Sequence, residues 1–257
     1  MEPSTSEILD VPPYHKLAEI YDVVMSHIDY EDWVGFLQDL CGHHGIETRR
    51  VLDISCGTGK TLPYMDGWCE SIYGMDVSFP MVKQLVTSIP DMRSKVWVGD
   101  MSALPVCGDF PLILNLQDSV NYYLKPEEFL SHLHEVHSHL TRDGYYLFDL
   151  STELNVRRNF LDFHEVYEDE SWGYERVNRY LNRKQLNITE FYIWEDRDGG
   201  KTTYRERHFQ RMYTAEELKD ILKKSPFRSW WLYGDITLRA PDQDAERIHV
   251  VATRDDS

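Results

Sequence analysis

Between residues 49 and 150 the sequence alternates short apolar runs with amphipathic segments, and this alternation restricts the chain to one class of fold. The apolar runs predict five strands, at residues 49–55, 71–78, 95–102, 110–117 and 145–150. Apolar residues at helical spacing predict helices at 79–89 and 126–140, and a shorter helix is expected at 61–68. Strands that alternate with helices form an open, mostly parallel α/β sheet with right-handed crossovers.

After residue 152 apolar and charged residues alternate, which is typical of antiparallel strands with one exposed face. Four such strands are expected, at residues 163–170, 174–182, 185–196 and 201–213, with a turn at Asp198-Gly199-Gly200. A helix with a capping box at 214–225 and two closing strands at 229–237 and 246–254 follow. Near the N-terminus, residues 14–41 predict two short helices.

These changes of pattern predict a Rossmann-like, mostly parallel sheet flanked by helices, with additions at two places. We expect an N-terminal helical segment over residues 1–45 and an antiparallel β insertion over residues 153–212. Residues 46–152 plus 213–257 then form the core of the fold. A length of 257 residues with 42% hydrophobic content suits one elaborated domain of this kind.

Charge and composition exclude several classes of partner. The net charge is −17, so that the chain would repel a nucleic-acid backbone or an anionic membrane. No apolar run approaches the roughly 18–20 residues of a membrane span. The opening residues lack the basic start and apolar stretch of a secretory signal, and the four cysteines show no disulfide or metal spacing. We therefore expect a cytoplasmic protein.

The strongest functional signal is the sequence VLDISCGTG, residues 51–59, which leaves the first strand of the sheet. Small residues at this place let the backbone turn tightly and approach a ligand. Asp76 ends the second strand, where a carboxylate can bind both ribose hydroxyls of a nucleoside. Ligands of open α/β sheets bind at the carboxyl ends of strands, so the two features together predict a nucleoside site.

Two better-known phosphate motifs do not fit this loop. Gly59-Lys60-Thr61 looks like the end of a P-loop, but that motif requires a glycine where the chain has Ile54. The dinucleotide fingerprint requires a third glycine where the chain has Leu62. Both a P-loop nucleotidase and a nicotinamide-dependent dehydrogenase are therefore disfavoured.

The motifs, in order and spacing, resemble the class I S-adenosylmethionine-dependent methyltransferases. VLDISCGTG is similar to their VLDxGCGTG loop, with Ser55 at the position of the first glycine. YGMDVS resembles the strand that ends in the ribose-binding acid, GDMSALP the segment around the adenine, and LNLQDSVNYY the strand and loop beside the methyl group. The resemblance implies S-adenosylmethionine as cofactor. The contact residues that it implies are Asp53, Ser55, Cys56, Gly57, Gly59, Asp76, Val77, Asp100, Met101 and Gln117.

A narrower resemblance concerns the segments outside the core. YDVVMSHIDYEDWVGFL and RERHFQRMYTAEELKDIL are similar to segments of small-molecule methyltransferases such as glycine N-methyltransferase and the N-methyltransferases of antibiotic amino sugars. In these relatives the first segment is a lid whose tyrosine covers the methionine end of the cofactor. This implies that role for Tyr21, with Tyr14 as a further contact. The inserted strands imply a roof over the substrate pocket.

The implied reaction is methyl transfer to a small molecule, with an amine favoured as the acceptor. An enzyme of this kind has to hold the nucleophile in line with the methyl group and take up a proton from the amine. The candidate catalytic residues are Tyr21, Asp118 and His208, and the phenols of Tyr14 and Tyr122 are further candidate bases. Asp118 is expected to face the methyl group, whereas strand alternation alone does not decide whether His208 points inward.

Two further patterns have simpler explanations. His132, His134, His137 and His139 share one helix, but its apolar stripe predicts that most of them face solvent, and no metal site is expected. Six arginines cluster on the insertion, at Arg176, Arg179, Arg183, Arg205, Arg207 and Arg211. Acidic residues among them favour cross-strand ion pairs over the recognition of an anionic substrate group.

Three alternatives stay open. The same fold could act on RNA or on a protein side chain, although the net charge speaks against RNA. A non-catalytic module could keep the cofactor site as a sensor. A nicotinamide-dependent oxidoreductase is disfavoured by Leu62 and by the two closing strands. The expected partner is a small-molecule methyl acceptor, and the sequence leaves the oligomeric state open, a homodimer included.

Overall fold

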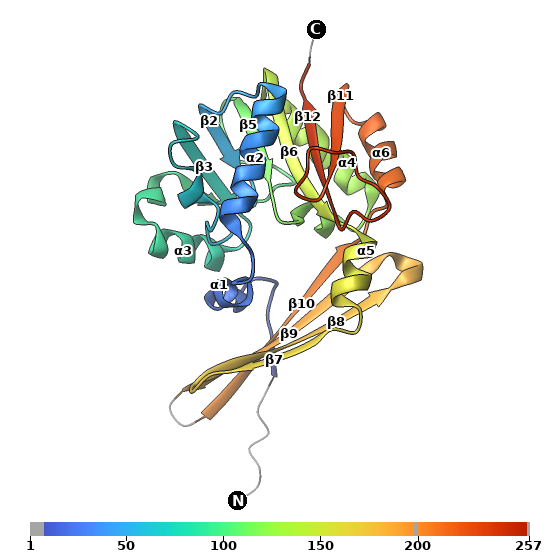
Figure 1. Cartoon of the computed structure of the whole chain (residues 1–257). Coiled ribbons are helices and arrows are strands. Elements are labelled where there is room, and N and C mark those ends of the chain that lie inside the picture. The colour runs from blue at the N-terminus through green and yellow to red at the C-terminus, as the bar shows by residue number, and fades with distance from the viewer. Residues whose placement is uncertain (1–7, 198–199, 256–257) are drawn as a thin grey trace, which may run out of the picture.

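The structure is a computed structural model that describes residues 8–197 and 200–255. The predicted turn at Asp198-Gly199-Gly200 therefore lies outside the described residues, apart from Gly200. The described chain forms a large sheet between helices and, below it in Figure 1, a second, smaller sheet. No helix of this described part is both long and apolar enough to cross a membrane.

The large sheet has seven strands in the order β11-β12-β6-β5-β2-β3-β4. Five consecutive strands, from β6 to the edge strand β4, pair in parallel, whereas β12 pairs antiparallel with both β6 and β11. The strands are β2 (Arg50–Asp53), β3 (Ser71–Asp76), β4 (Val96–Val98), β5 (Phe110–Asn115), β6 (Leu140–Ser151), β11 (Ser229–Gly234) and β12 (Arg247–Thr253). The predicted class, a Rossmann-like and mostly parallel sheet flanked by helices, is confirmed.

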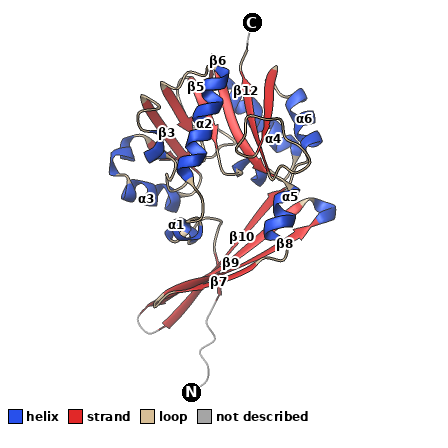
Figure 2. Cartoon of the chain, viewed as in Figure 1, coloured by secondary structure: helices blue, strands red, loops and turns tan. Residues whose placement is uncertain are grey.

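Helices cover both faces of this sheet (Figures 1 and 2). α2 (Tyr30–His44) and α3 (Phe79–Ser88) pack on one face, and α4 (Pro126–Ser138) and α6 (Ala215–Lys224) pack on the other. The apolar stripe of α4 explains its orientation, because Phe129, Leu133 and Val136 recur at helical spacing and are all fully buried. α6 begins with the predicted capping box, in which Thr214 and Glu217 bond each other's backbone N–H.

The second sheet has five strands in the order β1-β10-β9-β8-β7. Its strands are β1 (Ile8–Asp10), β7 (His164–Glu168), β8 (Trp172–Leu181), β9 (Leu186–Arg197) and β10 (Gly200–Arg211). α5 (Glu153–Asn155) and a π-helical turn (Val156–Phe160) connect it to β6, and β10 leads back toward the core (Figure 1). Its inner face is apolar in part, with Tyr174, Phe191 and Ile193 buried.

The N-terminal segment lies between the two sheets (Figure 1). A 3-10 turn (Leu17–Glu19) and the single turn α1 (Tyr21–Val24) pack on the inner face of the second sheet. Only one regular helix, α2, follows in this region, and it is capped by Asp29 at its start and by Gly45 at its end. The prediction of two helices here is confirmed, although the first is only one turn long and the second, with 15 residues, is longer than expected.

Two further predictions are corrected by the structure. Residues 61–68 form no helix beyond a 3-10 turn (Leu62–Met65), since Pro63 removes a donor and Gly67 adopts a positive φ of 77°. His132 does not face solvent but is fully buried, with its ring nitrogens bonded to the Met101 carbonyl and the Tyr146 hydroxyl. The remaining short helices are 3-10 turns at Pro90–Ser94, Ser119–Tyr122 and Asn182–Lys184.

Candidate active site

The glycine loop after β2 is shaped for close approach of a ligand. Gly57 and Gly59 adopt positive φ values of 52° and 78°, which favour glycine. A side chain at Gly59 would lie 2.8 Å from Leu85, whereas a Cβ at Gly57 would point into open space. Ser55, in place of the first family glycine, is not among the residues with positive φ, and its hydroxyl donates to Asn115 at 3.0 Å. Serine therefore fits this position.

Asp76 joins the loop to the end of β3. One carboxylate oxygen accepts the Gly57 N–H at 3.0 Å, and the other accepts the Ser78 N–H at 2.8 Å. Burial raises the pKa of Asp76, which these two backbone bonds oppose. A carboxylate has about four lone-pair positions, so about two remain for further donors. Asp76 can therefore accept two hydroxyl groups of a ligand without losing its place.

An exposed apolar edge lies beside Asp76. Val77 and Phe79 follow it and are 65% and 64% exposed, and Val98 at the end of β4 is also exposed. Asp100 accepts the Ser102 N–H at 2.8 Å, and the Met101 sulfur accepts from Asn115 at 3.3 Å. A flat apolar ring placed here would cover side chains that water now contacts.

Two cavities meet in front of these strand ends. The small cavity, about 70 Å³, is lined by Tyr14, Tyr21, Tyr30, Asp53, Ser55, Cys56, Gly57, Thr58, Lys60, Thr61, Asp76, Met81, Leu116, Gln117 and Ser119. Its volume is much less than that of a nucleoside, so it could hold only part of one. Asp53 at its floor is buried, and this burial raises the pKa of its carboxyl to about 7.

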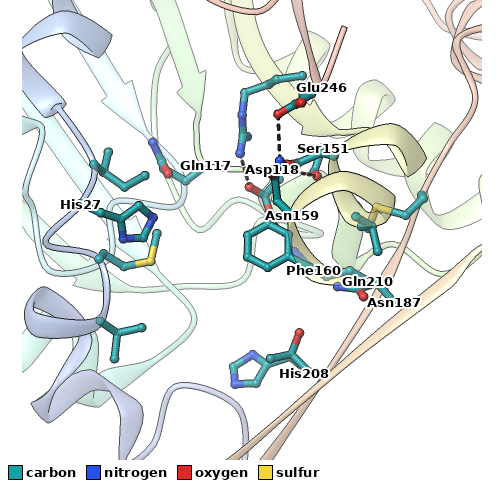
Figure 3. A pocket seen from close by; sticks show the side chains of 18 of the residues that line it. His27, Gln117, Asp118, Ser151, Asn159, Phe160, Asn187, His208, Gln210 and Glu246 are labelled. Atoms are coloured by element: carbon teal, nitrogen blue, oxygen red, sulfur yellow. Dashed lines mark hydrogen bonds and ion pairs between the residues drawn. The ribbon is translucent and has the colours of Figure 1, made fainter. Parts of the chain in front are cut away.

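The large cavity lies between the two sheets and measures about 560 Å³. Residues of the N-terminal segment, of the large sheet and of the second sheet line it together. Figure 3 shows Gln117, Asp118, Phe160, His208 and Gln210 around this space. Tyr14, Tyr21 and Gln117 line both cavities, so the two spaces adjoin at these three side chains.

A chain of hydrogen bonds starts where the cavities adjoin. The hydroxyls of Tyr14 and Tyr122 are 2.7 Å apart, and the Tyr122 hydroxyl is 2.8 Å from Nδ1 of His208. His208 is 4% exposed and points inward, which answers the question that the sequence left open. Burial raises the pKa of Tyr14, Tyr21 and Tyr122. These phenols therefore stay protonated at neutral pH, and none of them is a base by itself.

Glu206, two residues from His208 on the same face of β10, was not predicted from the sequence. Its carboxylate is fully buried and accepts the backbone N–H groups of Tyr14 and Leu17, both at 2.7 Å, and that of Lys16. His208 Nε2 lies 3.4 Å from the same carboxylate. Glu206 thus fixes the N-terminal segment on the second sheet and places a negative charge beside the imidazole.

Asp118 lines the large cavity, and both of its carboxylate oxygens are bonded to other side chains. One oxygen binds Arg247 at 2.8 Å and the other accepts from Gln210 at 2.7 Å. Arg247 also binds Asp149 of β6. Burial raises the pKa of Asp118, an effect that the Arg247 guanidinium opposes. Asp118 is therefore held in place by an ion pair and a hydrogen bond from two different strands.

Arg176 of β8 lines the large cavity. Its guanidinium lies over the rings of Phe160, Phe163 and Phe191, 4.9–5.5 Å from their centroids. Its Nε atom is buried without a hydrogen-bond partner in the described structure, and Glu165, which lies opposite it on β7, is the charged group with the largest effect on its guanidinium. Other arginines of the sheet do pair with acids: Arg179 with Glu190 and Arg205 with Asp10 across strands, as expected, and Arg211 with Glu217 of α6.

Comparison with known proteins agrees with this geometry. A family described as a methyltransferase domain matches residues 51–144, the stretch from β2 into β6. Residues 51–144 therefore form a methyltransferase domain. A methyltransferase-named protein of Geobacillus sp. (strain WCH70) is 25% identical to the whole chain over 246 residues, which cover 94% of this chain and 99% of that protein.

Solved structures show which known folds this chain resembles. An S-adenosylmethionine-dependent methyltransferase from Clostridium acetobutylicum aligns with a TM-score of 0.77 and 20% identity, over 93% of this chain and 97% of that one. A sugar N-methyltransferase from Streptoalloteichus sp. ATCC 53650 aligns with a TM-score of 0.75 and 19% identity, over 99% and 98%. The predicted fold and a methyltransferase domain are thus confirmed.

Proposed function

We propose that this protein moves the methyl group of S-adenosylmethionine to an amine nitrogen of a small, polar acceptor in the large cavity. The observation that carries the proposal is the junction of the two cavities at Tyr14, Tyr21 and Gln117. A donor in the small cavity and an acceptor in the large one would meet there. The hydrogen-bonded chain to His208 starts at the same place.

The cofactor side of the site follows from the loop geometry. When bound, S-adenosylmethionine supplies a methyl group that its sulfonium already activates. In our proposal Gly57 and Gly59 let the backbone approach it, and Asp76 accepts its ribose hydroxyls with the two lone pairs that remain. Val77, Asp100 and Met101 then border the adenine. Asp53, Ser55, Cys56 and Gln117 lie toward the methionine end, which Tyr21 covers from the N-terminal segment.

A small acceptor is supported by the shape of the large cavity. A volume of about 560 Å³ suits a molecule of the size of a sugar or an amino acid derivative. In the proposal the N-terminal segment acts as a lid and the second sheet as a roof, which together would keep a protein or RNA strand out. The relative from Streptoalloteichus is named a sugar N-methyltransferase, and the amine acceptor is our extension of that name to this chain.

The proton of the amine needs a path away from the reacting nitrogen. In our proposal the amine donates to the Tyr14 hydroxyl, Tyr14 passes its own proton to Tyr122, and Tyr122 passes its proton to Nδ1 of His208. The imidazolium that forms lies 3.4 Å from the Glu206 carboxylate, which stabilises the added charge. His208 is thus the terminal base, and the two phenols carry the proton while remaining neutral.

Arg176 suggests a second feature of the acceptor. The Arg176 guanidinium lies among aromatic rings and lines the same cavity as the reacting end, and its Nε has no hydrogen-bond partner in the described structure. Arginine binds carboxylate or phosphate with two parallel hydrogen bonds. We therefore propose that the acceptor carries an anionic group at Arg176, at the opposite end from its amine.

Methyl transfer with a labelled donor tests the proposal directly. The enzyme, S-adenosylmethionine with a labelled methyl group and a panel of small amines would be incubated together, and products analysed by mass spectrometry. We expect label on nitrogen, and faster transfer to amines with a carboxylate or phosphate than to neutral analogues of the same size. Label on oxygen or sulfur only would contradict the amine assignment. Tight cofactor binding without transfer to any acceptor would favour the sensor alternative.

A further inference from the structure

The end of β5 holds an unusual backbone conformation. Gln117 and Asp118 are consecutive non-glycine residues with positive φ values of 59° and 52°. This left-handed region places Cβ of an L-residue close to its own backbone, so two such residues in succession need support from their surroundings. Strained backbone of this kind is found where a structure must aim a side chain at a ligand.

Asp149 supplies that support from the neighbouring strand β6. Its carboxylate is fully buried; Oδ1 accepts the Gln117 N–H at 2.8 Å and Oδ2 accepts the Asp118 N–H at 2.9 Å. Arg247 of β12 binds Oδ2 of Asp149 and also the Asp118 side chain at 2.8 Å. Three adjacent strands therefore hold this turn, and Asp149 bonds both strained residues at once.

The turn directs Gln117 to the place where the cavities adjoin. Gln117 lines both of them, and its Nε2 is buried without a hydrogen-bond partner among the described residues. A buried amide donor of this kind is costly unless a ligand oxygen accepts from it. Asp149 itself is not among the residues that line either cavity.

We infer that Asp149 is a positioning residue that holds the Gln117–Asp118 turn, so that the Gln117 amide donates to the amino-acid end of the cofactor. This inference rests on the proposed cofactor site. With the ribose at Asp76, the remainder of the ligand extends along the small cavity toward Leu116 and Gln117. Loss of Asp149 should therefore weaken contacts at the amino-acid end and spare those of the nucleoside.

The substitution Asp149→Asn tests this with little change of size. In asparagine one of the two carboxylate oxygens becomes an NH₂ group, which donates and does not accept. Only one of the two backbone N–H groups then keeps its acceptor, and the other faces the NH₂ group. Two probes separate the ends of the ligand: S-adenosylhomocysteine, and 5′-methylthioadenosine, which has the same nucleoside without the amino-acid end. Binding of both would be measured by calorimetry on the full chain, with Asp143→Asn, an exposed acid of the same strand, as control.

The expected result is an affinity for S-adenosylhomocysteine at least tenfold weaker in Asp149→Asn, with the affinity for 5′-methylthioadenosine changed less than twofold. Gln117→Ala should show the same pattern, and the double variant should be no weaker than either single one. Equal loss of both probes, or no loss, would overturn the inference. If the wild-type protein bound neither probe, the proposed function would fail instead.

A second measurement does not depend on the variant folding. Among the described residues the Gln117 and Asp118 amides bond only to Asp149, so their hydrogen exchange reports on that carboxylate. We expect them to exchange as slowly as the amides of β5. Exchange at the rate of an exposed loop would show that Asp149 does not hold the turn, and would overturn the inference.

Discussion

The Tyr122 hydroxyl and Nδ1 of His208 lie 2.8 Å apart, although the two residues belong to different sheets. Tyr122 follows β5 of the large sheet, and His208 lies on β10 of the second one. The bond therefore joins the two sheets at the wall of the large cavity. In the proposed reaction it is the last step by which a proton leaves the acceptor amine.

Removal of this bond should slow methyl transfer. Tyr122→Phe interrupts the path between Tyr14 and His208, and we expect kcat to fall about 100-fold, the lower end of what general-base catalysis contributes. The affinity for S-adenosylhomocysteine should stay within about twofold. Initial rates with the best acceptor of the amine panel measure kcat, and calorimetry measures the affinity for S-adenosylhomocysteine.

Tyr123→Phe is the matched control for that prediction. Its hydroxyl is buried without a hydrogen-bond partner in the described structure, and it lines neither cavity. The control should keep the wild-type rate. Equal rates in Tyr122→Phe and the wild type would show that the proton leaves by another route.

Arg176 should determine which acceptors are used. A charged hydrogen bond contributes about 1.5–3 kcal/mol, so Arg176→Gln is expected to raise KM for an anionic amine roughly 10- to 100-fold. A neutral amine of the same size should be affected less than twofold. Arg179→Gln is the control, because Arg179 lies on the opposite face of the same strand with a 66% exposed side chain. Similar losses for neutral and anionic acceptors would contradict this role.

Asp53 should make the unliganded protein less stable as the pH rises. Its pKa is raised from 3.8 to about 7 in the folded chain, so between these values the unfolded chain ionises first and folding loses free energy. Asp53→Asn removes this effect and keeps an oxygen for the Ser55 N–H. The variant should match the wild type near pH 4 and exceed its unfolding free energy by up to about 4 kcal/mol at pH 8. Urea unfolding of both proteins at pH 4 and pH 8 would measure these free energies. A difference between variant and wild type that is the same at both pH values would refute the prediction.

Glu206 should hold the N-terminal segment in place. In Glu206→Gln an NH₂ group replaces one of the oxygens that accept the N–H groups of Tyr14, Lys16 and Leu17. We expect a loss of about 1–3 kcal/mol in unfolding free energy and faster proteolysis within residues 8–25. Glu190→Gln, on the exposed face of the same sheet, should change neither. Unchanged proteolysis in Glu206→Gln would mean that other contacts hold the segment.

The sequence allowed the sheet and the cofactor loop to be predicted, because each depends on local pattern. Alternating apolar runs predicted the strands, and the acid after β3 was expected where Asp76 lies. Contacts between distant residues left no such signal. Glu206 and Tyr14 are 192 residues apart, and Asp118 and Arg247 are 129 apart.

The orientation of the inserted strands was equally hidden. Strand alternation places Glu206 and His208 on one face, but it does not say which face meets the large sheet. The same alternation separates Arg176 from Arg179, so one arginine enters the cavity while the other pairs with an acid on the outside. The six arginines therefore could not be treated alike, and only the packing of the two sheets distinguishes them.

The most direct test of the account is whether Asp76 holds an adenosyl ligand. Unfolding of the purified chain would be followed with S-adenosylhomocysteine or NAD present, for the wild type and Asp76→Ala. A ligand at 100 times its dissociation constant stabilises a fold by about 2.7 kcal/mol. We predict that S-adenosylhomocysteine raises the wild-type midpoint, that NAD does not, and that Asp76→Ala abolishes the shift. An equal shift in Asp76→Ala, or a shift with NAD alone, would contradict the proposed site.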